Sequence, residues 1–144
     1  MKVEPINVLL VDDDRDDMEL TIEALKDSKL FLHIDSLYDG EQALAFLKQQ
    51  GKYADAPRPD LILLDLNLPR VSGRQVLEKI KADPDHKRIP VVILTTSSAD
   101  RDVLETYNLG ANCFVTKPVD LDQFVTVVGA LKDFWFTIVK LPDR

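Results

Sequence analysis

Four short apolar segments of this 144-residue chain are each followed directly by an acidic, hydroxyl or basic side chain. A group of carboxylates repels itself unless a cation lies among them, and Mg²⁺ is usually held by one or two carboxylates together with water and phosphate oxygens. A lysine and a hydroxyl could bind the same phosphate oxygens, and phosphoryl transfer depends mainly on such positioning and charge neutralisation. The side chains are Asp12, Asp13 and Asp14 after residues 8–11, Asp65 after 61–64, Thr95 after 91–94, and Lys117 after 112–116.

Each of these residues alone also has an ordinary structural explanation. An aspartate after a strand is often the N-cap of the next helix, and this explains Asp12, Asp13 or Asp14 singly as well as a functional role does. We assign Asp14, Asp16 and Asp17 to a solvated first helical turn that the helix dipole favours. A single site nevertheless explains all four segment ends more economically than four unrelated explanations.

Strand-like and helix-like segments alternate along the chain, and this alternation predicts how such a site is assembled. Five alternating pairs indicate an α/β fold, a doubly wound five-stranded parallel sheet with five helices. Functional groups of such sheets gather beyond the carboxyl ends of the strands. We expect strands at residues 8–11, 32–36, 61–64, 91–94 and 112–116, and helices at about 14–27, 40–50, 72–82 and 100–109, with Gly110 as a cap and a last helix that Asp120 caps.

The composition is that of an ordinary globular protein, and it limits the expected partners. Hydrophobic residues make up 45% and charged residues 30% of the chain, and the net charge of −7 argues against nucleic acid or an anionic membrane. Cys113 is the single cysteine, so no internal disulfide can form. The chain starts without the layout of a signal peptide and has no apolar run of the ~20 residues that a membrane span needs. We therefore expect one cytoplasmic domain over residues 1–144.

In these residues the chain resembles the receiver domain of two-component response regulators, over essentially its whole length. The shared motif is the acidic pair Asp12 and Asp13, then Asp65, then Thr95 30 residues later, then Lys117 after a further 22. The resemblance implies a flavodoxin-like sheet in the order 2-1-3-4-5. It also implies that Asp65 accepts a phosphoryl group, so that the protein signals rather than acts as an enzyme on other molecules.

The resemblance implies a metal site and a switch around this acceptor. Asp13, Asp65 and the backbone carbonyl of Asn67 hold Mg²⁺, and Asp12 acts through a water molecule.

The implied switch begins with Lys117, which binds the phosphoryl group. Thr95 then gains a phosphoryl oxygen as a partner that it lacked, and Phe114 turns inward. From the residues alone, Phe114 is better explained as a core aromatic. The resemblance also implies a cis peptide bond between Lys117 and Pro118.

A narrower resemblance, to regulators of cyanobacterial and other bacterial phytochromes, lies in residues 51–69 and 88–97 and in the tail from Phe134 to Leu141. It implies a phytochrome histidine kinase as the phosphodonor.

The last helix and the aromatic extension at about 133–144 contain more apolar residues than one buried stripe needs. We expect Leu121, Phe124, Val128, Leu131 and Trp135 to face the core. A second apolar side predicts a homodimer or partner surface. A tail folded back on its own domain is the alternative. The interface residues expected are Val127, Phe134, Trp135 and Phe136.

Two other functions fit parts of the pattern. A phosphatase of the haloacid dehalogenase type also uses a strand-end aspartate, a lysine and Mg²⁺, and Asp12 with Asp14 could form its nucleophile motif. That reading leaves Asp65 without a role, and it needs an acidic pair where Asp120 and Asp122 open a helix instead. A receiver fold that binds partners without being phosphorylated is the second alternative.

Overall fold

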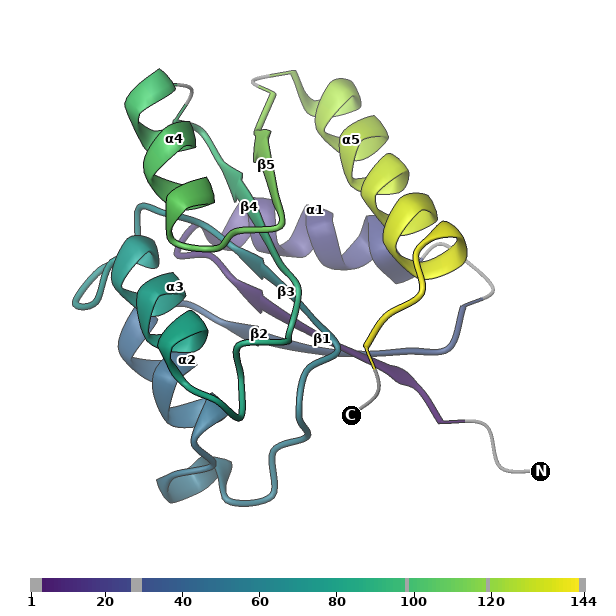
Figure 1. Cartoon of the computed structure of the whole chain (residues 1–144). Coiled ribbons are helices and arrows are strands. Elements are labelled where there is room, and N and C mark those ends of the chain that lie inside the picture. Colours follow the sequence, from purple (N-terminus) through teal and green to yellow (C-terminus); the bar gives the residue numbers. More distant parts are fainter. Residues whose placement is uncertain (1–3, 27–29, 98, 119, 143–144) are drawn as a thin grey trace.

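Five parallel strands form one sheet in the order β2-β1-β3-β4-β5, which confirms the predicted fold class and strand order (Figure 1). The computed structural model describes residues 4–26, 30–97, 99–118 and 120–142. The register between β1 and β3 pairs Val11 with Leu64, so Asp12 and Asp65 leave the sheet side by side. The strands are β1 (Ile6–Val11), β2 (Leu32–Leu37), β3 (Leu61–Leu64), β4 (Val91–Thr95) and β5 (Cys113–Thr116).

Helices cover both faces of this sheet, as a fully apolar strand requires. In Figure 1, α1 and α5 lie on one side of the sheet, and α2, α3 and α4 lie on the other. Successive side chains of a strand point to opposite faces. Leu9 therefore packs in the cluster with α2 and α3, and Leu10 in the cluster with α1 and α5. The helices are α1 (Arg15–Lys26), α2 (Gly40–Leu47), α3 (Gly73–Ala82), α4 (Asp100–Asn108) and α5 (Leu121–Asp133).

Aspartate side chains cap the first turns of α1 and α5. Asp14 accepts hydrogen bonds from the N–H groups of Asp16 and Asp17, and Asp120 accepts one from Gln123. The cap predicted for Asp120 is thus confirmed, and Asp14, expected in a solvated first turn, caps α1 from just before it. Gly110 has φ 106°, so it ends α4 in the left-handed conformation that glycine adopts readily.

Helix α3 begins so close to the end of β3 that only glycine fits there. A Cβ on Gly73 would lie 2.1 Å from the backbone oxygen of Asp65. The N–H of Gly73 donates to the carbonyl of Leu66 at 2.9 Å, which fixes the loop after Asp65 against the helix. This loop therefore has little room to shift.

Three expectations about local structure are wrong. Helix α2 ends at Leu47 rather than at residue 50, because Gln49 has φ 54° and cannot continue a right-handed helix. Leu121 is 57% exposed and does not face the core. The described residues contain no cis peptide bond, so Lys117–Pro118 is trans, the form that X–Pro bonds favour by about 0.5–1 kcal/mol.

Among the described residues, no helix combines the length and apolar character needed to cross a membrane. The chain after α5 continues as a short π-helix, Phe134–Ile138, labelled η2. A single 3₁₀ turn, η1 (Gly51–Tyr53), lies in the loop before β3.

Candidate functional site

Asp65 stands directly after β3, and both of its carboxylate oxygens have partners. Its Oδ1 accepts a hydrogen bond from the hydroxyl of Thr95 at 2.8 Å and another from the N–H of Asn67 at 3.1 Å. Its Oδ2 accepts from the ammonium of Lys117 at 3.1 Å. The residue is 6% exposed, so these contacts replace most of its hydration. The sequence prediction that these strand-end residues meet is confirmed for Asp65, Thr95 and Lys117.

Lys117 lies between three carboxylates, and its side chain is 3% exposed. The distances from Nζ are 2.5 Å to Asp12 Oδ2, 3.0 Å to Asp17 Oδ2 and 3.1 Å to Asp65 Oδ2. An ammonium has three donors, so each donor of Lys117 has one carboxylate partner.

Asp17 is the member of this group that the sequence reasoning missed. The sequence predicts a solvated helical turn for Asp17, but its side chain reaches Lys117. Side chains of a helix tilt toward its N-terminus, which directs the first turn of α1 back toward the sheet edge. The place of Asp17 in the first turn of the helix that directly follows β1 was the available signal.

The pKa values of Asp12 and Lys117 are shifted by different causes. Burial raises the pKa of Asp12 to about 6, although hydrogen bonds from Lys117 and from the Asp14 N–H oppose the shift. Burial alone would lower the pKa of Lys117, but the hydrogen bond to Asp12 and the charges of Asp12 and Asp65 outweigh it and raise that pKa. The ammonium of Lys117 has several negative neighbours and stays charged. Each carboxylate shares this one positive charge with the others, so its own negative charge is only partly neutralised.

The acidic pair and Asp65 together form a set of oxygen ligands suited to a divalent cation. Carboxylate oxygens of Asp12, Asp13 and Asp65 all lie within 4.8 Å of one another. Hard cations such as Mg²⁺ and Mn²⁺ prefer ligand sets made only of oxygen. The backbone of Asn67 is next to this cluster, because its N–H donates to Asp65 Oδ1 at 3.1 Å. The donor set therefore fits a bound divalent metal ion.

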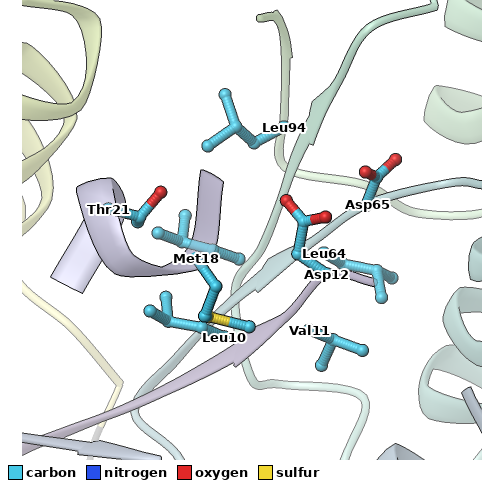
Figure 2. Close-up of a pocket in the computed structure, with 9 residues that line it drawn as sticks. Leu10, Val11, Asp12, Met18, Thr21, Leu64, Asp65 and Leu94 are labelled. Carbon is cyan, nitrogen blue, oxygen red and sulfur yellow. The ribbon is translucent and has the colours of Figure 1, made fainter. Parts of the chain in front are cut away.

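Apolar side chains from β1, β3, β4 and α1 lie next to the carboxylates of Asp12 and Asp65. Figure 2 shows the carboxylates of Asp12 and Asp65 near each other beside these apolar side chains. A cavity of about 10 Å³ lies between the ends of β1, β3 and β4 and the residues Met18 and Thr21 of α1. Apolar walls strengthen the electrostatic interactions of nearby charges. The residues that line the cavity are Leu10, Val11, Asp12, Met18, Thr21, Leu63, Leu64, Asp65 and Leu94.

The switch residues differ in how they are placed. Thr95 is fully buried and already donates to Asp65, which corrects the expectation that its hydroxyl lacks a partner before phosphorylation. Phe114 is partly buried and packs against the core cluster on the α2 and α3 side. Its backbone N–H donates to the hydroxyl of Tyr107 on α4 at 3.2 Å.

The structure separates the residues expected at an interface. Trp135 is 7% exposed and belongs to the core cluster with α1 and α5, and Phe136 is partly buried against the same cluster. Phe134 is 49% exposed and Ile138 is 72% exposed. Val127 is of intermediate exposure. The tail thus folds back on its own domain and still leaves apolar side chains on the surface.

Comparisons with known proteins decide the family. Residues 8–129 match the model of the response regulator receiver domain. The chain belongs to this family. The receiver chain is 49% identical to Response regulator Rcp1 of Synechocystis sp. over 138 residues, which cover 96% of this chain and 94% of that protein.

Two solved structures are similar to this receiver along nearly its whole length. The phosphorylated cyanobacterial phytochrome response regulator RcpA has a TM-score of 0.95 and 44% identity, covering 97% of this chain and all of that one. The Mn²⁺-bound form of Rcp1 has a TM-score of 0.94 and 48% identity, covering 96% of this chain and all of that one. The chain is therefore a response regulator homologous to Rcp1 and RcpA. It acts in signalling, in a family whose partners are histidine kinases.

Proposed function

We propose that Asp65 accepts a phosphoryl group from a phosphohistidine of a sensor histidine kinase and that this event switches the conformation of the receiver. The observation that carries the proposal is the set of contacts to Asp65. Its oxygens are within hydrogen-bond distance of a hydroxyl and an ammonium, and two further carboxylates complete a metal-binding cluster beside it. These are the groups that position and neutralise a transferring phosphoryl group.

In the proposed reaction an oxygen of Asp65 attacks phosphorus in line with the leaving imidazole nitrogen. The P–O bond forms as the P–N bond breaks, and the imidazole leaves with the electron pair and takes up a proton. Lys117 neutralises charge on the phosphoryl oxygens. Bound Mg²⁺ supplies further neutralisation of the same oxygens. Water later attacks the acyl phosphate, which returns the carboxylate of Asp65 and inorganic phosphate.

The hydrogen bond from Thr95 to Asp65 determines which contact changes when Asp65 is phosphorylated. Because the hydroxyl already donates to Asp65, phosphorylation exchanges its partner from a carboxylate oxygen to a phosphoryl oxygen. The resulting shift of the segment after β4 would give Phe114 room to move inward. Such a local change of charge and contacts that biases two arrangements is a common form of molecular switch.

The metal in this proposal is Mg²⁺, held by Asp13, Asp65 and the carbonyl of Asn67, with Asp12 acting through water. The ligand set supports it, and the relative Rcp1 has been solved with Mn²⁺, a cation of similar ligand preference. The receiver promotes only its own phosphorylation and dephosphorylation and is not an enzyme for other substrates.

We further propose a phytochrome histidine kinase in the cytoplasm as the phosphodonor. The support is the similarity to RcpA, which is described as a phytochrome response regulator.

Residues 1–144 act as a single receiver domain, and residues 133–144 extend it. Phe134 and Val127, with the exposed Ile138, supply the apolar surface for a homodimer through the C-terminal helix.

Mass spectrometry of the intact protein after treatment with acetyl phosphate and Mg²⁺ tests the proposal. We expect one added phosphoryl group in the wild type and none in Asp65→Asn. An addition that instead depends on Asp12 would support the phosphatase, although Asp120 caps α5. Within the described part of the chain, the acidic group placed to hold a metal is Asp12, Asp13 and Asp65. A wild type that takes up no phosphoryl group would support a phosphorylation-independent binding module.

A further inference from the structure

The contacts of Lys117 include one partner that neither metal binding nor phosphoryl transfer requires. Asp12 and Asp65 belong to the metal cluster, but Asp17 comes from the first turn of α1, outside that cluster. An acidic residue in a first turn is often present only because it interacts favourably with the helix dipole. That explanation does not account for a 3.0 Å contact with an ammonium whose side chain is 3% exposed.

The geometry points to Asp17 as a positioning residue that competes with the phosphoryl group on Asp65 for Lys117. This inference rests on the proposed function. All three donors of Lys117 are occupied in the unphosphorylated protein, so a phosphoryl oxygen gains an ammonium partner only as a carboxylate contact weakens. Asp17 is the most exposed of the three carboxylates, at 26% compared with 13% for Asp12 and 7% for Asp65.

The exposure of Asp17 explains why it can both hold Lys117 and release it. A buried carboxylate that loses its cation stays desolvated, which is costly, whereas water can replace the lysine contact of a partly exposed one. Asp17 therefore retains Lys117 until a phosphoryl group offers more charge. As long as Asp17 is charged, part of the positive charge of Lys117 is directed away from Asp65, which lowers the affinity of the site for phosphoryl oxygens.

Beryllofluoride, a noncovalent mimic of a phosphoryl group, provides an equilibrium test that does not depend on turnover. Its binding at saturating Mg²⁺ can be followed by ¹⁹F NMR in the full chain. Asp17→Asn keeps the size and an oxygen acceptor but removes the charge, and we expect about fivefold tighter binding, the scale of a partly exposed ion pair. Asp17→Glu restores the charge, and we expect its affinity to return toward that of the wild type.

Asp16→Asn is the matched control, because Asp16 is exposed on the same helical turn and its loss changes the net charge equally. Its affinity for beryllofluoride should equal that of the wild type. Unchanged or weaker binding by Asp17→Asn, or an equal gain in Asp16→Asn, would overturn the role of Asp17. If the wild type binds no beryllofluoride and acetyl phosphate does not phosphorylate it, the proposed function fails as well. Wild-type binding that Asp65→Asn abolishes separates the two cases.

Discussion

The hydroxyl of Thr95 donates to Asp65 Oδ1 over 2.8 Å, between two side chains that lie at the ends of neighbouring strands and are almost fully buried. The hydrogen bond joins β4 to β3 beyond their last backbone contact. Through this hydrogen bond, a change in the chemical state of the Asp65 carboxylate affects the conformation of the segment after Thr95. Several consequences of this and the other contacts at the site can be measured.

Thr95→Val keeps the shape of the side chain and removes the hydroxyl. We expect the free energy of unfolding of the metal-free protein to fall by about 1.5–3 kcal/mol, the range for a hydrogen bond to a charged group. Phosphorylation of Asp65 should persist, but the conformational response should be lost. Urea unfolding and NMR spectra with and without beryllofluoride measure the two effects. Thr96→Val, at the exposed neighbouring position, is the control, and an equal loss there would contradict the expectation.

Lys117→Met removes the cation from a group of three carboxylates. We expect the metal-free protein to lose about 3–5 kcal/mol of unfolding free energy, because breaking a buried ion pair leaves uncompensated charge. Mg²⁺ should restore part of the loss, since it replaces some of the missing positive charge. Thermal unfolding with and without Mg²⁺ measures this rescue. Lys87→Met changes an exposed lysine and should show neither effect.

The raised pKa of Asp12 predicts a specific pH dependence of stability. Its pKa is about 6 in the folded protein and has an ordinary value of 3.8, so the folded state binds the proton more tightly. The contribution of Asp12 to stability therefore increases as pH falls from above 6 toward 4, and it is least favourable above pH 6. We expect about 1–2 kcal/mol, less than the full shift implies at about 1.4 kcal/mol per pKa unit, because the group is partly solvated.

Urea unfolding of metal-free wild type and Asp12→Asn at pH 7.5 and pH 5 isolates this contribution. The neutral asparagine should remove the pH-dependent difference that Asp12 causes. Identical pH dependence in both proteins would contradict the assignment. Protons and divalent cations compete for the same oxygens, so Mg²⁺ affinity should also fall as pH drops below about 6.

Gly73→Ala tests how closely the start of α3 must approach Asp65. The added Cβ would lie 2.1 Å from the Asp65 backbone oxygen, so the loop must shift. We expect a loss of roughly 3 kcal/mol or more in unfolding free energy and slower phosphorylation by acetyl phosphate. Gly129→Ala on α5 is the matched control, because a Cβ there meets no atom within 4 Å. Alanine in that helix should stabilise the protein by about 0.5–1 kcal/mol.

Phe134→Ser tests the proposed dimer surface. Truncation after Asp133 is a poor test, because it also removes Trp135 from the core and destabilises the domain. The point substitution leaves Trp135 in place, and sedimentation velocity should show a shift from dimer to monomer. Leu104→Ser alters an apolar residue on α4 that is even more exposed, at 64% compared with 49% for Phe134, and should leave the dimer intact. A dimer that survives Phe134→Ser would place the interface elsewhere.

Four residues of the site could be predicted from the sequence because functional groups of a parallel sheet gather beyond the carboxyl ends of its strands. Asp12, Asp65, Thr95 and Lys117 follow directly on apolar strands, and a parallel sheet brings such positions to one edge whatever the details of packing. The order of strands and helices along the chain could be predicted from the same alternation of segments. These predictions needed only the direction of each strand and the alternation with helices.

The features that were missed depend on side-chain reach and packing. Asp17 lies on a helix, and its contact with Lys117 depends on how α1 sits over the sheet. The exposure of Leu121 depends on the exact rotation of α5, and one stripe of apolar residues does not fix that rotation. The early end of α2 follows from the left-handed conformation of Gln49, a residue whose type gives no strong signal for it.

The three carboxylate contacts of Lys117 also decide which atom at this edge of the sheet can act as a nucleophile. An amine reacts with acyl phosphates only through its lone pair, and a raised pKa keeps that lone pair protonated. Small donors such as acetyl phosphate, which modify neutral amines, therefore meet an unreactive ammonium here. Asp65 offers a carboxylate oxygen a few ångströms away. The ion pairs thus disfavour acylation of the Lys117 amine, which water would not reverse. They leave a carboxylate oxygen as the nucleophile, and the acyl phosphate proposed to form there is open to hydrolysis.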